Sequence, residues 1–131
     1  RQKARNIRAA CRRIRDDFGG RVPDTMEGLV SLPGVARKTA NIVLSEAYGK
    51  NEGIAVDTHV IRLANRLGFT REKDPVRIER DLTALFPRRE WWNVSSCLVF
   101  HGRAVCGARR PRCGACAVET LCPRRGVSSA P

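Results

Sequence analysis

The sequence is poor in aromatic side chains and in long apolar segments. Seven of its 131 residues are Phe, Trp or Tyr, although 42% of the residues are apolar. This apolar content is sufficient for a hydrophobic core without disulfides, but the core has to be aliphatic. No apolar run approaches the roughly 18 residues of a membrane-spanning helix, and the composition excludes collagenous and low-complexity chains.

The first residues lack both an initiator methionine and the apolar segment of a signal peptide. The chain opens with the basic stretch RQKARNIRAACRRIR. We therefore expect an intracellular protein, cytoplasmic or nucleoid-associated, whose sequence here is truncated at the N-terminus.

Acidic residues are scarce beside basic ones, with 13 Asp and Glu against 25 Lys and Arg and a net charge of +12. Residues 1–21 hold eight basic and two acidic side chains, and residues 101–131 hold six and one. Two basic ends are typical of a protein that neutralises nucleic-acid phosphates. The alternative is a surface charged for solubility. An anionic membrane is disfavoured because the expected helices have narrow apolar faces.

Hydrophobic periodicity predicts an almost entirely helical chain. Apolar residues at helical spacing over residues 4–18 predict a first helix, and no segment alternates as a strand would. Further helix starts are expected at the capping-box-like segment Asp24-Thr25-Met26-Glu27, at about Arg37, at Asp57-Thr58, at Asp74-Pro75 and at about Glu90. We expect an all-α protein with a helical domain over 1–104, a cysteine loop over 105–123 and a frayed tail over 124–131.

Four of the six cysteines are concentrated near the C-terminus. Their spacing is C-x6-C-x2-C-x5-C, formed by Cys106, Cys113, Cys116 and Cys122. So short a loop has little core of its own, and the spacing favours a metal centre over a disulfide framework. Spacing alone leaves zinc and an iron–sulfur cubane open. Cys11 and Cys97 fall on apolar helix faces and are expected to be small core residues.

A second pattern is a proline–glycine break between two predicted helices, followed by a lysine and, further on, an aspartate. A tight turn at such a junction exposes backbone N–H groups to a phosphate, although an ordinary connection between helices has the same features. Lys38 and Asp57 each lie at the start of a helix. The positive end of a helix favours the neutral form of an amine and the ionised form of a carboxylate. Singly they are a surface lysine and an N-cap, but together they suit an amine nucleophile beside a permanent anion.

Three segments carry a resemblance to a known family: LPGVARKTANIVL, IAVDTHVIRLANRLG and the cysteine tail. In this order they resemble endonuclease III, in the iron–sulfur branch of the helix–hairpin–helix DNA glycosylase superfamily, from Gln2 to Cys122. The resemblance implies an all-α bundle with a helix–hairpin–helix over about 25–48. It also implies a 4Fe–4S cluster on the four clustered cysteines and catalytic roles for Lys38 and Asp57.

The resemblance further implies an activity and a partner. We expect a monomeric base-excision-repair DNA glycosylase that removes oxidised pyrimidines through a lysine Schiff base. An AP lyase step then cuts the strand 3′ to the lesion. The partner is double-stranded DNA containing damaged pyrimidines or abasic sites. The residues expected to bind DNA belong to the hairpin and to the cysteine loop: Leu32, Pro33, Gly34, Val35, Ala36, Arg37, Arg109, Arg110 and Arg112.

Two departures from the family pattern qualify the implied activity. Ala36 stands where the family usually has a second glycine. Alanine is acceptable there if the residue is already helical, and we expect a slight local adjustment with phosphate binding retained. The family also has a substantial segment upstream of Arg1 that forms half of the lesion pocket, so weak or no glycosylase activity is expected of this chain alone. The alternatives are a non-catalytic DNA-binding module and the adenine-mismatch branch, whose members lack a lysine at the position of Lys38.

Overall fold

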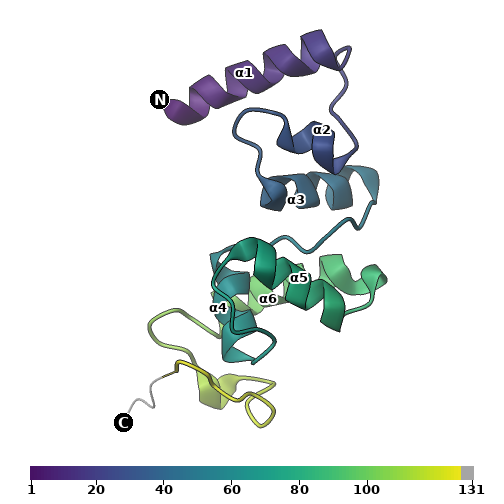
Figure 1. Cartoon of the computed structure of the whole chain (residues 1–131). Coiled ribbons are helices and arrows are strands. Elements are labelled where there is room, and N and C mark those ends of the chain that lie inside the picture. The colour runs from purple at the N-terminus through teal and green to yellow at the C-terminus, as the bar shows by residue number, and fades with distance from the viewer. Residues whose placement is uncertain (128–131) are drawn as a thin grey trace. The chain divides into compact units, whose positions relative to one another are not determined.

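The structure, a computed structural model, describes residues 1–127, and these are helical apart from their turns and loops. The all-α prediction is confirmed. The chain divides into two compact units, Arg1–Glu52 and Gly53–Pro131 (Figure 1). The boundary falls inside the segment 1–104 that was expected to be one helical domain.

The N-terminal unit contains three helices: α1 (Gln2–Asp17), α2 (Met26–Val30) and α3 (Arg37–Tyr48). Helices α2 and α3 pack against each other as a hairpin. Their shared core consists of four buried aliphatic residues, Leu29, Leu32, Ala40 and Leu44. Gly49 ends α3 in the left-handed conformation, with φ of 63°.

Helix α1 contributes less to this core than its periodicity predicts. Its second half does contact the core through Ala10 and Ile14, but no residue of α1 is fully buried. Ile7 is 63% exposed and Cys11 is also exposed. The regular apolar spacing therefore predicts the helix correctly. The apolar residues of α1 are covered only where they pack against α2 and α3.

The short helix α2 begins one residue later than the capping-box pattern predicts. Thr25 is its N-cap, and the Thr25 hydroxyl accepts a hydrogen bond from the backbone N–H of Gly28 at 3.2 Å. The Asp24 carboxylate is instead paired with the Lys50 ammonium at 2.6 Å. The Asp24 carboxylate, which the capping-box pattern assigned to the N-cap of this helix, therefore forms a long-range ion pair instead.

The C-terminal unit contains the helices α4 (Thr58–Arg66), α5 (Pro75–Leu85) and α6 (Trp91–Ala104) and two 3-10 turns, η1 (Arg88–Glu90) and η2 (Cys113–Ala115). Helix α4 packs against both α5 and α6. Asp57 and Asp74 are the N-caps of α4 and α5, and these predicted helix starts are confirmed.

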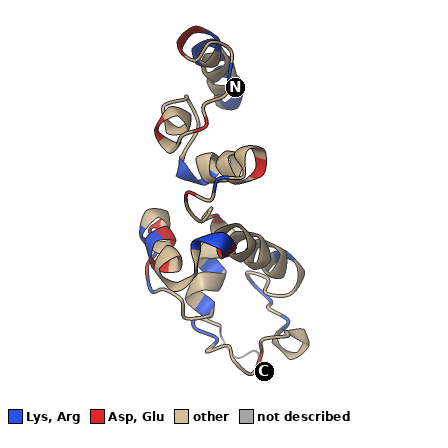
Figure 2. Cartoon of the chain, turned by 90° about the vertical axis from the view of Figure 1, so that its right-hand side faces the viewer, with Lys and Arg blue, Asp and Glu red and all other residues tan. Residues whose placement is uncertain are grey.

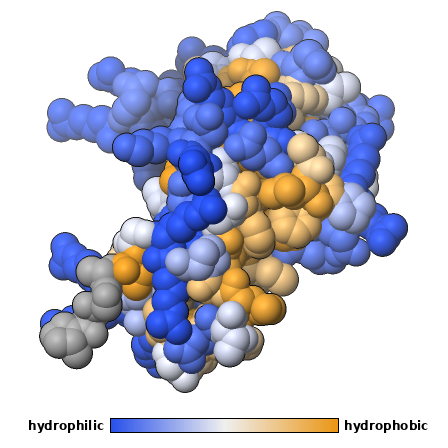
Figure 3. All heavy atoms as spheres, turned by 60° about the horizontal axis from the view of Figure 1, so that its bottom comes forward, coloured by the Kyte–Doolittle hydropathy of each residue, from blue (hydrophilic) through white to orange (hydrophobic). Residues whose placement is uncertain are grey.

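The core of this unit is aliphatic, as the scarcity of aromatic residues predicts. Its buried members are Ile54, Val56, Val60, Leu63, Ala64, Ile78, Leu82 and Leu98. Phe69 and Phe86 lie at its edge, partly buried, with ring centroids 5.4 Å apart in an edge-to-face contact. Some apolar surface remains in contact with solvent (Figure 3). Phe100 in this unit is 65% exposed.

The last described residues return to α4. The backbone N–H of Arg125 donates to the carbonyl of Arg66 at 3.2 Å, and the Arg124 guanidinium pairs with Glu119 at 2.6 Å. Residues 128–131 of the expected frayed tail lie outside the described residues. Among residues 1–127, none of the helices combines the length and the apolar character that crossing a bilayer requires.

Candidate functional site

The connection between α2 and α3 is a tight turn. The backbone N–H of Val35 donates to the carbonyl of Leu32 at 3.1 Å. Pro33 occupies the second position of this turn, and Gly34 occupies the third with φ of +82°. Proline followed by a residue with positive φ defines a type II turn, in which glycine avoids the steric cost of the left-handed region.

Gly34 is required by its neighbours as well as by its backbone conformation. A Cβ atom at this position would lie 2.7 Å from the side-chain nitrogen of Asn6, which belongs to α1. Helix α1 therefore supports the hairpin turn from within the same unit. Sequence reasoning missed Asn6, because a polar side chain on the polar face of a helix gives no signal of such a contact.

Ala36 is not helical, so the condition under which alanine was expected to be acceptable is not met. It is the N-cap of α3, with an extended backbone at φ of −101° and ψ of 169°. Alanine is nevertheless free of strain there, because φ is negative and only the left-handed region favours glycine. The Ala36 side chain makes no capping hydrogen bond to α3. The first turn of this helix therefore keeps the character of an anion-binding helix end.

Lys38 is the second residue of α3, and its side chain is exposed. It lies two residues after Ala36, at the same end of α3 as the hairpin turn. In the C-terminal unit, Asp57 is half-buried, and its Oδ1 atom accepts from the backbone N–H groups of His59 and Val60 at 2.8 and 2.9 Å. Both capping bonds go to Oδ1, so the second carboxylate oxygen, Oδ2, takes no part in them.

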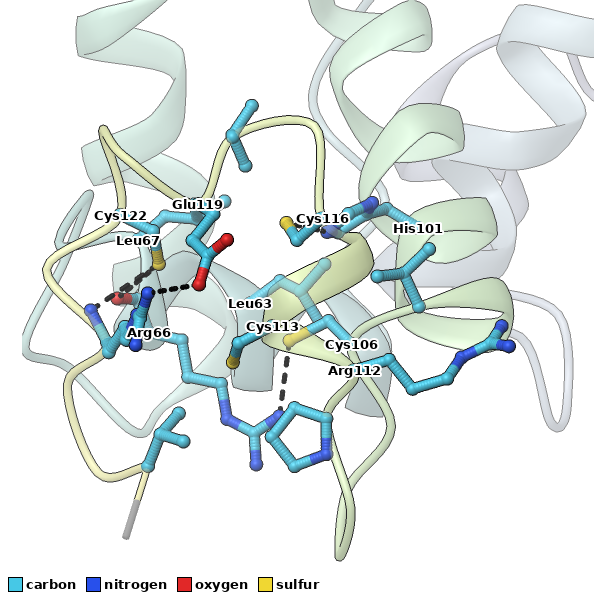
Figure 4. Close-up of a pocket in the computed structure, with 15 residues that line it drawn as sticks. Leu63, Arg66, Leu67, His101, Cys106, Arg112, Cys113, Cys116, Glu119 and Cys122 are labelled. Atoms are coloured by element: carbon cyan, nitrogen blue, oxygen red, sulfur yellow. Dashed lines mark hydrogen bonds and ion pairs between the residues drawn. The ribbon is translucent and has the colours of Figure 1, made fainter. Parts of the chain in front are cut away.

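All four cysteines of the C-terminal loop line one pocket with about 420 Å³ of empty space, counting the part open to solvent (Figure 4). They are free thiols and half-buried. Among residues 1–127, no three His, Cys, Asp or Glu side chains converge closely enough to hold a single metal ion. Cys11 and Cys97 lie elsewhere and are exposed, so the expectation that they are core residues is wrong.

The wall of this pocket opposite the loop comes from α4 and α6 (Figure 4). Arg66, the last residue of α4, is 8% exposed and donates to the sulfur of Cys106 at 3.2 Å. His101, near the end of α6, places Nε2 3.4 Å from the sulfur of Cys116. Sequence reasoning missed both residues. The sequence did offer one signal for them. Both the arginine and the histidine occupy helix positions that continue an apolar face, where a polar side chain is expected to have a buried partner.

A second arginine of α4 binds backbone carbonyl groups at the start of the same loop. Arg62, one helical turn before Arg66, donates to the carbonyl of Gly102 at 3.0 Å and to the carbonyl of Cys106 at 3.1 Å. A Cβ atom at Gly102 would lie 2.8 Å from Nδ1 of His59 and 2.9 Å from an Nη atom of Arg62, so a side chain there would have to displace both groups. Helix α4 thus has a capping carboxylate at one end and two loop-binding arginines towards the other.

The arginines predicted to bind DNA in the cysteine loop lie around a second hollow, beside the cysteine pocket. Its lining includes Arg66, Arg109, Arg110, Arg112 and Arg124, and no acidic residue is among its described lining residues. Arg109, Arg110 and Arg112 are exposed. Arg112 also donates to the carbonyl of Ala104, which ties the loop to the end of α6. Lys and Arg residues occur along the chain in both units (Figure 2).

Residues 1–88 match the HhH-GPD superfamily of base excision DNA repair proteins, and the chain belongs to that superfamily. It is 57% identical over 128 residues to endonuclease III of Synechocystis sp., covering 98% of this chain and 58% of that protein. The resemblance to endonuclease III is thereby confirmed. The chain spans a little over half the length of the curated relatives it matches.

Two solved structures extend the similarity to the fold. A non-covalent endonuclease III–DNA complex superposes with a TM-score of 0.89 at 42% identity, over 95% of this chain and 58% of that one. A trapped endonuclease III–DNA covalent intermediate superposes with a TM-score of 0.88 at 42% identity, over 94% and 58%. The fold described above is therefore also the fold of proteins that have been observed on DNA.

Proposed function

We propose that this protein is a bifunctional DNA glycosylase and AP lyase that removes oxidised pyrimidines from double-stranded DNA. One observation carries the proposal. The exposed amine of Lys38 follows the hairpin turn in a chain that is 42% identical to an endonuclease III trapped covalently on DNA. A DNA substrate would place the protein at the nucleoid.

Binding begins with the phosphate backbone. The first turn of α3, which follows an N-cap alanine, and the type II turn of Leu32–Val35 offer backbone N–H groups to a phosphate. Arg109, Arg110 and Arg112 supply a second cationic surface. Such contacts position the protein without reading sequence, which suits an enzyme that searches for lesions in any context.

The chemistry begins with an extruded nucleotide, and a damaged base that stacks poorly costs less to extrude. The Lys38 amine forms a bond to the anomeric carbon of the sugar. The glycosidic bond breaks, and the base leaves with the bonding electron pair and takes up a proton. Asp57 stabilises the positive charge that develops on the sugar, while its Oδ1 atom caps α4.

The lyase step uses the Schiff base that results when the sugar ring opens. Its positive nitrogen acidifies the neighbouring C–H group of the sugar. Loss of that proton forms a carbon–carbon double bond and expels the 3′ phosphate, which cuts the strand 3′ to the lesion. Hydrolysis of the Schiff base returns the free Lys38 amine.

The cysteine pocket fits a 4Fe–4S cluster, with Cys106, Cys113, Cys116 and Cys122 as ligands. Four free thiols line one pocket, and four thiolates are the ligand set of a 4Fe–4S cluster. The resemblance to endonuclease III favours this cluster over zinc, which thiolates also bind. Once bound, the cluster supplies structural order to the arginine-bearing loop. Iron analysis of anaerobically purified protein should find about four irons per chain.

The test of the enzymatic proposal is covalent trapping. Protein incubated with an abasic duplex and borohydride should form a reduced cross-link, with the Synechocystis endonuclease III as positive control. Lys38→Gln should abolish trapping and leave duplex binding almost unchanged, because one cation among 25 contributes little affinity. Lys3→Gln, at an exposed lysine of the same unit, is the matched control and should trap normally. Duplex binding without any trapping by the unaltered chain would instead identify a non-catalytic DNA-binding module.

A further inference from the structure

Three of the four sulfur atoms in the cysteine pocket lie within hydrogen-bonding distance of a nitrogen. Arg66 donates from its guanidinium to Cys106 at 3.2 Å. The ring of His101 lies 3.4 Å from Cys116 through Nε2. The third bond comes from the backbone N–H of Arg124, which donates to Cys122 at 3.4 Å. Two of these three nitrogens belong to side chains of α4 and α6. Residues of the helices therefore lie next to the cysteine sulfur atoms.

Arg66 is buried, and among residues 1–127 its guanidinium has no ion pair with an acidic side chain. Its side chain is confined to the pocket wall, with 8% of the residue exposed. The described contacts of its guanidinium are the Cys106 sulfur and the carbonyls of Gly107 and Ala108, at 2.7 and 2.8 Å for the two oxygens. None of these contacts is to a carboxylate. A buried cation is costly unless a negative charge compensates it, and the group it faces is a thiol that ionises when it binds a metal.

His101 makes the same kind of contact from the other wall. Its side chain is half-buried and lies in the last turn of α6, five residues before Cys106. Beside a thiolate, which only accepts hydrogen bonds, Nε2 has to carry the proton and donate. Arg66 and His101 therefore present N–H groups to two sulfur atoms from two different helices.

We propose that Arg66 and His101 are positioning residues for the iron–sulfur cluster, which they retain and whose reduction potential they raise through N–H···S bonds to Cys106 and Cys116. The inference rests on the proposed cluster and adds the side chains that tune it. An N–H donor withdraws charge from a ligating sulfur, and the charge of Arg66 adds to this effect. Both favour the reduced, more negative state of a cluster. Donors in the outer shell also orient the ligands themselves, and their loss typically weakens metal binding by about 10–100-fold.

Arg62 offers a matched control on the same helix. It lies one turn before Arg66, is half-buried and contacts the same loop, but its bonds to the loop go to carbonyl oxygens. If the effect depends on N–H···S bonds, Arg66 and Arg62 should differ in their influence on the potential. If it depends on anchoring the loop, they should behave alike.

The experiment compares the cluster-loaded protein with Arg66→Gln, His101→Phe and Arg62→Gln. The readouts are the midpoint potential from film voltammetry on graphite and the rate of iron release to a chelator. Arg66→Gln and His101→Phe should each shift the potential to more negative values, with the larger shift for Arg66→Gln. Arg66→Gln should also release iron roughly 10-fold faster or more. Arg62→Gln should leave the potential at the wild-type value.

Each other result has a definite meaning. Equal potentials in the wild type, Arg66→Gln and His101→Phe overturn the inference, as does an Arg62→Gln shift as large as that of Arg66→Gln. His101→Phe keeps a planar ring in the pocket wall, so it carries the test by itself if circular dichroism shows Arg66→Gln to be unfolded. An unaltered chain that contains zinc and no iron overturns the proposed cluster itself, which separates that failure from a failure of this inference.

Discussion

Asp57 and Asp74 cap helices α4 and α5 in the same way, and this makes them a matched pair. In each, one carboxylate oxygen accepts from the second and third backbone N–H groups that follow, at 2.8 and 2.9 Å for Asp57 and at 3.0 Å twice for Asp74. A structural role would make the two residues equivalent. The proposed catalytic role distinguishes them.

We predict that, in a protein carrying the family's upstream segment, Asp57→Asn slows base excision by about 10²–10³-fold, because a charge that stabilises the transition state is lost. It should cost little stability, since asparagine caps a helix nearly as well as aspartate. Asp74→Asn should change neither property. Single-turnover excision kinetics and urea unfolding measure the two effects. Normal turnover in Asp57→Asn would show that Asp57 acts only as the N-cap of α4.

Gly34 in the hairpin turn can be compared with Gly20 in the same unit. Both have positive φ, 82° and 79°, but only at Gly34 would a side chain meet a neighbour, at 2.7 Å from Asn6. We predict that Gly34→Ala costs more stability than Gly20→Ala, whose cost of about 1 kcal/mol is backbone strain alone. Gly34→Ala should also weaken duplex binding. Urea unfolding and fluorescence anisotropy check the pair, and equal effects at both sites would contradict the contact with Asn6.

At the scale of elements, one ion pair fastens the segment before α2 to the end of α3. The Lys50 ammonium donates to the Asp24 carboxylate at 2.6 Å and to the Asp24 carbonyl at 2.8 Å. The hydrogen bond from Lys50, helped by its charge, holds the pKa of the Asp24 carboxyl below its usual value. Both side chains remain largely in solvent, so the pair contributes modestly and is screened by salt.

The pH dependence of this pair follows from the lowered pKa. Its stabilisation is fully present above the ordinary aspartate value of about 4 and is lost as the pH falls through the lower value of the folded state. Asp24→Asn should therefore be less stable than the wild type near pH 7, and the difference should shrink as the pH approaches about 2. Urea midpoints across this range measure the difference. A difference independent of pH would show that the carboxylate charge is not involved.

Helix α4 illustrates how one short element serves two tasks. Asp57 caps its N-terminus, while Arg62 and Arg66 bind the cysteine loop in the second half of the helix. The i and i+4 spacing places both arginines on one side of the helix. Between them, Leu63 and Ala64 are fully buried in the core of the unit. The packing of this core therefore orients both the capping carboxylate and the pocket wall.

At the scale of the whole molecule, the excess of basic residues implies binding that depends on salt. Raising salt from about 50 to about 200 mM should weaken duplex affinity by roughly 10³-fold if about six phosphates are contacted. Replacing Arg109, Arg110 and Arg112 with alanine should reduce the slope of log affinity against log salt by about three. Anisotropy titrations measure both. The control is Arg80→Ala, which removes an exposed arginine of α5. An unchanged slope in the loop variant would show that the three loop arginines do not contact phosphates.

The sequence by itself determined the helices, because their signals are local. Pro33 and Gly34 define a turn from their own backbone preferences, and Asp57 and Asp74 cap helices through N–H groups two and three residues away. The cysteine spacing likewise predicted one shared site, and the thiols do line one pocket. Short-range geometry of this kind is the same in any fold that contains these segments.

Burial and long-range pairing were decided by the tertiary structure alone. Periodicity placed Cys11 and Cys97 on apolar faces, yet both are exposed, because a helix face is buried only where another element covers it. Asp24 pairs with Lys50, 26 residues away, instead of capping α2. Arg66 reaches Cys106 across 40 residues of sequence. Nothing in either neighbourhood marks such contacts, since they exist only when packing brings distant segments together.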